Sequence, residues 1–268
     1  SYPDMVVLSG GVPVILNTHL EDNFKISPES LSEAITPRTK LLILNSPSNP
    51  TGAVYSAEEL AALTGVIEEA GILVISDDVY EKFVFDGTTF ANLPMAVPQL
   101  AENVIVINSA SKTYSMTGWR IGFALGPETI IKAATRIQGQ ATSCANSISQ
   151  KTLAFALQND ASVIEEFRKS FEKRRNLMFD GLSAIDGIKT FKPAGAFYLF
   201  SDVSSFYGKL SGVTDSVSFC DYLLVEHRIA AIPGQAFGED RCIRFSFVTD
   251  EASIRDGLLR LAEMSSSI

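Results

Sequence analysis

Three short aliphatic runs, each followed at once by polar residues, constrain the fold of this chain more than any other feature. The runs are Leu41–Leu44, Ile72–Ile75 and Val104–Ile107. Continuous runs of this length, rich in Ile and Val, are typical of strands covered on both faces of a parallel sheet. Between the first two runs, Ser56 and Glu59 form a capping-box pattern ahead of a helix that Gly71 would end. The sequence therefore predicts a βαβ unit.

Beyond these runs, the pattern up to residue 183 is mostly helical. We interpret the connection from Tyr80 to Ala101 as irregular, because it contains prolines and glycines and shows no helical stripe. A strand is expected at 120–125, and helices are expected at 128–139, 146–158 and 162–183. The last helix carries the charged run Arg168–Arg175, which we interpret as a solvated helix face.

From residue 188 the pattern changes to short strands interleaved with helices. Strands are expected at 190–191, 196–200, 229–232 and 242–247, helices at 215–227 and 251–264, and a surface loop at 208–214. This mixture is typical of a smaller α+β domain. We therefore predict a large domain at residues 1–165 and a small domain at residues 166–268, which includes the long connecting helix.

Composition and charge disfavour several classes of function. Acidic residues outnumber basic ones by 31 to 22, and nucleic-acid affinity rests on clustered Lys and Arg, so no nucleic-acid partner is expected. No apolar stretch reaches the roughly 20 residues that span a bilayer, so no membrane helix is expected. The cysteines, Cys144, Cys220 and Cys242, form no CxxC pair, and we expect reduced, partly buried thiols and no metal site. The two widely separated histidines also disfavour Ser-His-Asp catalysis.

Polar side chains follow the three predicted strands at one edge of the sheet. In an open parallel sheet, ligands bind outside the carboxyl ends of the strands, so this edge is the candidate site. The residues expected there are Asn49, Asp77, Tyr80, Ser109, Ser111, Lys112 and Arg120. Such a set suits no metal ion. It does suit a small, flat, anionic molecule that carries a carbonyl group.

Several motifs, in order along the chain, resemble those of fold-type I aminotransferases of class I/II. They are Asn45–Gly52, Ser76–Tyr80, Ser109–Lys112, Gly118–Gly122, Pro193–Tyr198, Pro233–Gly238 and Arg244–Ser246. Together they extend over essentially the whole chain, and the likeness is strongest to bacterial aspartate and prephenate aminotransferases. The resemblance implies an α/β fold, with a mostly parallel three-layer αβα large domain that is incomplete at its N-terminus. A smaller α+β C-terminal domain would follow it.

The resemblance implies that the site binds pyridoxal 5'-phosphate. Lys112 would join the cofactor through a Schiff base and later shuttle a proton. Asp77 would pair with the pyridine nitrogen and keep it protonated, and Asn49 and Tyr80 would hydrogen-bond the 3-oxygen of the ring. The residues by themselves also allow plainer interpretations, namely a surface lysine, a helix-capping acid, a turn asparagine and a core tyrosine.

The resemblance also assigns groups to the anions. Ser109 and Arg120 would bind the cofactor phosphate, since a hydroxyl beside a planar guanidinium suits an oxyanion. Ser111 either joins them or stabilises its own loop. Asn49 and Arg244 would bind the substrate, with Arg244 on its α-carboxylate, because an Arg between apolar strand residues is rare unless its charge is paired. We interpret three aromatic residues of these motifs as packing residues, namely Trp119, Tyr198 and Phe237.

Members of the family are similar to this chain only from their middle onward. The first matching motif, Tyr2–Pro3 followed by Gly10–Pro13, would normally come after the second strand of the large sheet. We therefore expect a C-terminal fragment that lacks about a third of the large domain, including a phosphate-binding helix N-terminus and a ring-stacking aromatic. The chain alone is then expected to bind the cofactor weakly, if at all. At full length we expect a cytoplasmic homodimer.

The expected activity is exchange of an amino group between an L-amino acid, aspartate by preference, and a 2-oxo acid such as 2-oxoglutarate. Two alternatives stay open. One is a β-lyase or decarboxylase on the same scaffold, and the other is a ligand-sensing domain of a transcription regulator. Lys112, Asp77 and Arg244 do not distinguish among the three.

Overall fold

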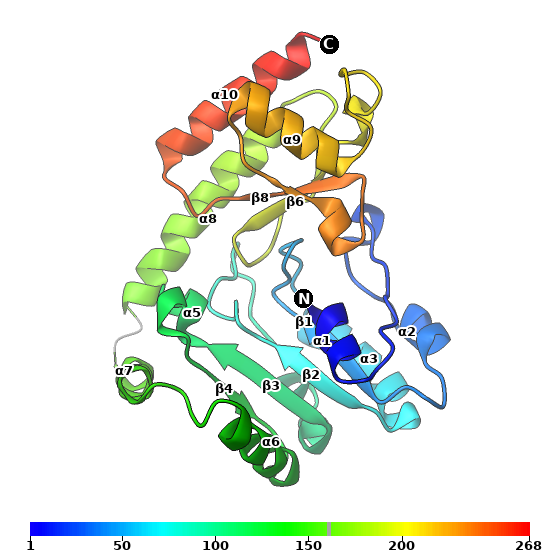
Figure 1. The fold of residues 1–268 in the computed structure, drawn as a ribbon, viewed down its shortest axis with the longest axis vertical. Helices are drawn as coiled ribbons and strands as arrows, with labels where there is room; N and C mark the ends of the chain where they lie inside the picture. Colours follow the sequence, from blue (N-terminus) through cyan, green and yellow to red (C-terminus); the bar gives the residue numbers. More distant parts are fainter. Residues whose placement is uncertain (160–161) are drawn as a thin grey trace.

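The computed structural model describes residues 1–159 and 162–268, which form two sheets with helices packed around them (Figure 1). The strands of the first sheet are β1 (Leu41–Asn45), β2 (Leu73–Asp77), β3 (Val104–Ser109) and β4 (Gly122–Leu125). They lie in the order β1-β2-β3-β4. β1, β2 and β3 are parallel, and β4 is antiparallel to β3. The prediction that the three aliphatic runs are parallel strands is confirmed.

The register of the first sheet brings the ends of its strands together. Asn45 pairs with Asp77 at the ends of β1 and β2, and Ser109 at the end of β3 pairs with Gly122 at the start of β4. A Cβ atom on Gly122 would lie 2.7 Å from the Asn108 carbonyl oxygen, so the close approach of β4 to β3 requires glycine. The predicted polar rim therefore lies along one edge.

Helix α3 (Ala57–Ala70) connects β1 to β2 as the sequence predicts. The Ser56 hydroxyl accepts a hydrogen bond from the Glu59 N–H, and the Glu59 carboxylate accepts one from the Ser56 N–H. Gly71 ends the helix in the left-handed region, with φ of 61°. The buried face of α3 carries Leu60 and Leu63, which belong to the same core cluster as residues of the first sheet.

The second sheet comprises β5 (Lys189–Thr190), β6 (Tyr198–Asp202), β7 (Ile232–Pro233) and β8 (Cys242–Ser246). It is antiparallel, in the order β5-β6-β8-β7. Figure 1 shows this sheet together with α8 (Ser162–Ser183), α9 (Ser216–His227) and α10 (Glu251–Ser266), with α10 running beside α8. Phenylalanines fill the core here, among them Phe197, Phe219 and Phe247. This is the predicted α+β arrangement, and the domain boundary after residue 165 stays a prediction.

The remaining elements are short or peripheral. They are α1 (Tyr2–Leu8), η1 (Leu20–Asp22), α2 (Pro28–Ala34), α4 (Leu93–Ala96), η2 (Pro98–Asn103), α5 (Ala110–Thr113), η3 (Thr117–Trp119), α6 (Glu128–Ala141), α7 (Ser147–Gln158), η4 (Ser204–Phe206) and η5 (Gly234–Phe237). No helix among the described residues is long and apolar enough to cross a membrane.

Backbone contacts join the two sheets at the chain leading into β6. The Gly195 N–H donates to the Gly52 carbonyl and the Ala196 N–H donates to the Phe83 carbonyl, both at 2.9 Å. Gly52 has φ of 71°, and a Cβ atom there would lie 2.3 Å from Cβ of Pro193. The segment that leads into β6 is thus held directly against the loops that follow β1 and β2 of the first sheet.

The structure corrects the interpretation of the Tyr80–Ala101 connection as irregular. It contains α4, which Asn92 caps by accepting from the Met95 N–H, and the 3-10 helix η2, which begins at Pro98. Helices this short make no apolar stripe, so the periodicity of the sequence could not reveal them.

The charged run of α8 is not solvated throughout. Arg175 is 0% exposed, and its guanidinium donates to both carboxylate oxygens of Asp86, at 3.0 and 2.8 Å, and to the Pro193 carbonyl at 2.8 Å. The solvated-face interpretation is therefore wrong for this residue. Its partners come from distant parts of the chain, so the local charge pattern could not predict them.

All the strand boundaries predicted after residue 119 differ somewhat, with β5 one residue earlier than expected and β8 one residue shorter. The strand expected at 120–125 begins at Gly122, because Arg120 has φ of 50° at the end of η3. The strand expected at 196–200 begins at Tyr198, since Ala196 has φ of 56°. The strand expected at 229–232 is reduced to Ile232–Pro233.

The expectation of partly buried thiols holds for two cysteines. Cys220 and Cys242 are buried, and burial raises the pKa of each thiol to about 12, whereas Cys144 is exposed. All three are free. Among the described residues, no group of His, Cys, Asp and Glu could hold a metal ion.

Candidate active site

Asn45 ties the ends of β1 and β2 to the loop that carries Asn49. Its side-chain nitrogen donates to the Asp77 carbonyl at 2.9 Å, and its side-chain oxygen accepts from the Asn49 N–H at 2.8 Å. The Asp77 carboxylate in turn accepts a close hydrogen bond from the Tyr2 hydroxyl and a weaker one from the Val79 N–H at 3.3 Å. The backbone segments that carry Asn49 and Asp77 are therefore fixed relative to each other.

Arg244 reaches the same place from β8 of the second sheet. Its Nη1 donates to Oδ1 of Asn49 at 2.7 Å. Its guanidinium carbon lies 4.4 Å from the ring centre of Tyr198 and 5.1 Å from that of Phe237. Its Nε is buried without a hydrogen-bond partner, and no carboxylate among the described residues forms an ion pair with it. No carboxylate of the described residues neutralises this charge, so the guanidinium suits an external anion, and the assignment of Arg244 to the substrate carboxylate stays a prediction.

Lys112 lies close to the aromatic rings of Tyr80 and Phe197. Its Nζ is 5.9 Å from the ring centre of Tyr80 and 5.7 Å from that of Phe197. Partial burial, followed by the positive charges of Arg244 and Arg120, lowers the pKa of the Lys112 amine. A lowered pKa increases the neutral fraction of the amine, which is the nucleophilic form.

Tyr80 is 3% exposed, and its hydroxyl lies 2.9 Å from the hydroxyl of Tyr198, which is 7% exposed. Burial raises the pKa of Tyr80 above its ordinary range, and its proximity to Tyr198 adds to this effect. The phenol therefore stays protonated at neutral pH and can serve as a hydrogen-bond donor.

Ser109, Ser111 and Arg120 lie on the adjacent strand ends. The Ser109 hydroxyl accepts a hydrogen bond from the Ser111 N–H at 3.3 Å, and this bond caps the N-terminus of α5. Arg120 lies two residues before Gly122, the strand partner of Ser109, and its Nη1 donates to the Thr117 carbonyl at 2.8 Å. The structure thus puts a hydroxyl and a guanidinium on neighbouring backbone segments, with Arg120 turned toward its own loop.

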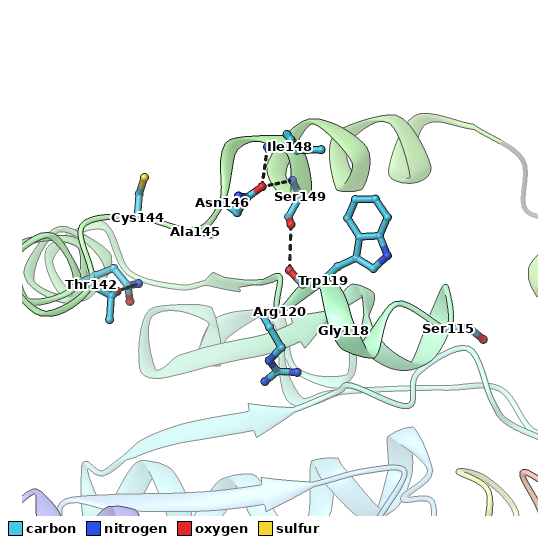
Figure 2. Close-up of a pocket in the computed structure, with 11 residues that line it drawn as sticks. Ser115, Gly118, Trp119, Arg120, Thr142, Cys144, Ala145, Asn146, Ile148 and Ser149 are labelled. Atoms are coloured by element: carbon cyan, nitrogen blue, oxygen red, sulfur yellow. Dashed lines mark hydrogen bonds between the residues drawn. The ribbon is translucent and has the colours of Figure 1, made fainter.

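A cavity of about 890 Å³ lies beside the η3 turn, and Figure 2 shows its lining, which includes Arg120. Ser149 donates to the Trp119 carbonyl at 3.0 Å, and Asn146 caps α7 beside it. In Figure 2 the Arg120 side chain points away from Ser149 and the residues around it. Trp119 is 44% exposed here, so interpreting it as a packing residue is wrong. This cavity does not contain Lys112, Asp77 or Arg244.

Sequence reasoning missed three contacts in the site. Tyr198 and Phe237, interpreted as packing residues, both contact the Arg244 guanidinium, and Tyr2 contacts Asp77. The position of Tyr198 at the end of the Pro193–Tyr198 motif was the available signal. For Tyr2 the local sequence held none, because its partner lies 75 residues away.

The arrangement fits a cofactor with a carbonyl group, a basic ring nitrogen and an anionic tail. Lys112 offers an amine of lowered pKa, Asp77 a carboxylate and Arg244 a buried nitrogen without a partner. The solved structures that are similar to this fold are pyridoxal-phosphate-dependent enzymes of fold type I.

The chain belongs to the aminotransferase class I and II family, whose sequence profile matches residues 1–261. Enzymes of this family depend on pyridoxal phosphate. The chain is 41% identical to an aspartate/prephenate aminotransferase from Nitrosomonas europaea, covering 99% of this chain and 68% of that protein. It is 41% identical to an aspartate aminotransferase from Geobacillus stearothermophilus, covering 97% of this chain and 66% of the relative.

A solved structure of the Rhizobium meliloti aspartate aminotransferase superposes with a TM-score of 0.94 at 40% identity, covering 99% of this chain and 68% of that one. A Thermus thermophilus aspartate aminotransferase with maleate superposes with a TM-score of 0.90 at 38% identity, covering 98% of this chain and 66% of that one. The chain therefore spans about two thirds of the length of these relatives.

Proposed function

We propose that the protein transfers an amino group between an L-amino acid, aspartate by preference, and a 2-oxo acid such as 2-oxoglutarate. The observation that carries this proposal is the half-buried Arg244 guanidinium, whose Nε is buried without a partner and whose Nη1 donates to Asn49. Every amino acid and 2-oxo acid presents a carboxylate, and a planar guanidinium binds a carboxylate through two parallel hydrogen bonds. The names of the relatives support aspartate as the donor.

When bound, pyridoxal phosphate supplies an electron sink that makes the proton on the substrate α-carbon acidic. Lys112 would hold the cofactor covalently and, once released from it, move that proton, a role that its lowered pKa supports. Asp77 would accept a hydrogen bond from the protonated ring nitrogen, and the hydrogen bond from Tyr2 fixes its orientation. Asn49 and Tyr80 would donate to the 3-oxygen of the ring.

The two anions of the reaction would lie at opposite ends of the site. Ser109 and Arg120, with Ser111 as a further hydroxyl, would bind the phosphate after Arg120 turns from the Thr117 carbonyl. Arg244 would bind the substrate carboxylate and hold the α-carbon near Lys112, whose pKa the positive charge of Arg244 helps to lower.

We further propose that these 268 residues by themselves bind the cofactor weakly, because the relatives contain about half as much chain again. Backbone N–H groups that cradle a phosphate would come from such additional chain. Resemblance to the family supports a homodimer, and the free thiols support a cytoplasmic location.

The decisive assay incubates the protein at full length with pyridoxal phosphate, aspartate and 2-oxoglutarate, and follows oxaloacetate and glutamate by NMR. We expect both products in equal amounts, no product from Lys112→Ala, and normal product from the exposed-lysine control Lys132→Ala. Release of more than one equivalent of keto acid per site from aspartate without 2-oxoglutarate would indicate a lyase, and failure to form glutamate would contradict the proposal.

A further inference from the structure

We propose that Tyr198 is a positioning residue for both halves of the site. Its hydroxyl lies 2.9 Å from that of Tyr80, to which it would donate, and its ring contacts the Arg244 guanidinium and would orient it. This inference rests on the proposed function, because Tyr80 and Arg244 are the groups assigned there to the cofactor oxygen and the substrate carboxylate. The inference adds that a single side chain, Tyr198, contacts both Tyr80 and Arg244.

The direction of the hydrogen bond between the phenols follows from proton counting. A phenol has one proton to donate and two lone pairs with which to accept. Within the described part of the chain, the hydroxyls of Tyr80 and Tyr198 bond only to each other, at 2.9 Å. If Tyr80 gives its proton to a cofactor oxygen, the proton between the two phenols must come from Tyr198. A phenol that accepts a hydrogen bond becomes a stronger donor, so Tyr198 would strengthen the bond from Tyr80 to the cofactor.

The ring of Tyr198 acts on a different group. The Arg244 guanidinium carbon lies 4.4 Å from its centre, within the range of a cation–π contact, and the strand register sets this position because Arg244 pairs with Phe200. A guanidinium stacked on a ring keeps its N–H edge free. Here that edge includes Nη1 on Asn49 and the buried Nε without a partner.

Two substitutions separate these roles. Tyr198→Phe removes the hydroxyl and keeps the ring, whereas Tyr198→Leu removes both. Tyr207→Phe is a matched control, because the Tyr207 hydroxyl donates to the Asp240 carbonyl outside the site. If circular dichroism shows that Tyr198→Leu does not fold, Tyr198→Met is used instead, because methionine retains more of the volume of the tyrosine side chain.

The first measurement is the absorbance titration of the covalent link between Lys112 and pyridoxal phosphate in the protein at full length. The bond from Tyr80 stabilises the negative ring oxygen and so lowers the pKa of that link. Tyr198→Phe should raise this pKa by about half a unit to one unit, with Tyr207→Phe unchanged. An identical pKa in the wild type and in Tyr198→Phe would overturn the hydroxyl role. A wild type that forms no such link would instead refute the proposed function.

The second measurement needs no cofactor. Succinate serves as a dicarboxylate probe for Arg244, and its dissociation constant is measured by calorimetry. Tyr198→Phe should stay within about twofold of the wild type, and Tyr198→Leu should bind about tenfold more weakly. Equal binding by Tyr198→Leu and the wild type would overturn the ring role, whatever the outcome with pyridoxal phosphate.

Discussion

Asp78 offers a direct test of the turn that carries Asp77 and Tyr80. Its carboxylate is 1% exposed and accepts hydrogen bonds from the Ser76 hydroxyl at 2.6 Å and from the Asn92 amide at 2.7 Å. Burial raises the pKa of Asp78 from 3.8 to about 6, against the effect of these two hydrogen bonds. The folded protein therefore holds this proton more tightly than the unfolded chain does.

The stability that the proton on Asp78 contributes is fully present below pH 3.8 and is lost as pH rises through about 6. The shift corresponds to about 3 kcal/mol of unfolding free energy. Asp78→Asn cannot titrate, so the stability difference between wild type and variant should change by about that amount over this window.

The assay is urea unfolding of both proteins from about pH 4 to pH 7, within the linear regime of denaturant dependence. Asp22→Asn, at an exposed position, is the control and should follow the wild type across the window. If wild type and Asp78→Asn show parallel pH dependence, Asp78 does not hold its proton in the folded state and the reasoning is refuted.

Three other substitutions test the site and its support. Gly52→Ala should lower the unfolding free energy by about 2–4 kcal/mol in urea titrations, because its Cβ would lie 2.3 Å from Cβ of Pro193 and its φ is 71°; wild-type stability would contradict the close approach. Tyr2→Phe should weaken pyridoxal phosphate binding about fivefold in fluorescence titrations, since Asp77 loses a hydrogen bond. Unchanged affinity would show that Tyr2 does not support cofactor binding. Arg244→Lys should bind succinate at least about tenfold more weakly by calorimetry, and equal binding would remove its proposed role.

Local patterns in the sequence account for the first sheet. The three aliphatic runs, the Ser56–Glu59 capping box and the Gly71 stop each depend on neighbouring residues, and the structure confirms all of them. Because parallel strands end at one edge, the rim that holds Asn49, Asp77 and Lys112 could also be predicted.

Contacts between distant segments could not be predicted in this way. The ion pair between Arg175 and Asp86 joins residues 89 positions apart, and the Tyr80–Tyr198 hydrogen bond joins residues 118 apart. Arg175 belongs to a run that is otherwise typical of a solvated helix, and its burial depends on how α8 packs on the loop that carries Asp86. Such pairings depend on tertiary packing, and no periodic pattern encodes them.

The central claim is that Lys112 is the residue that binds pyridoxal phosphate. The chain is incubated with millimolar pyridoxal phosphate at neutral pH, so that weak binding suffices, then reduced with borohydride and mapped by peptide mass spectrometry. Because its pKa is lowered, Lys112 should be labelled well ahead of Lys132, whose side chain is 68% exposed. Preferential labelling that Arg120→Ala diminishes is the predicted result. Labelling spread evenly over the lysines, with Lys112 no faster than Lys132, would contradict the account.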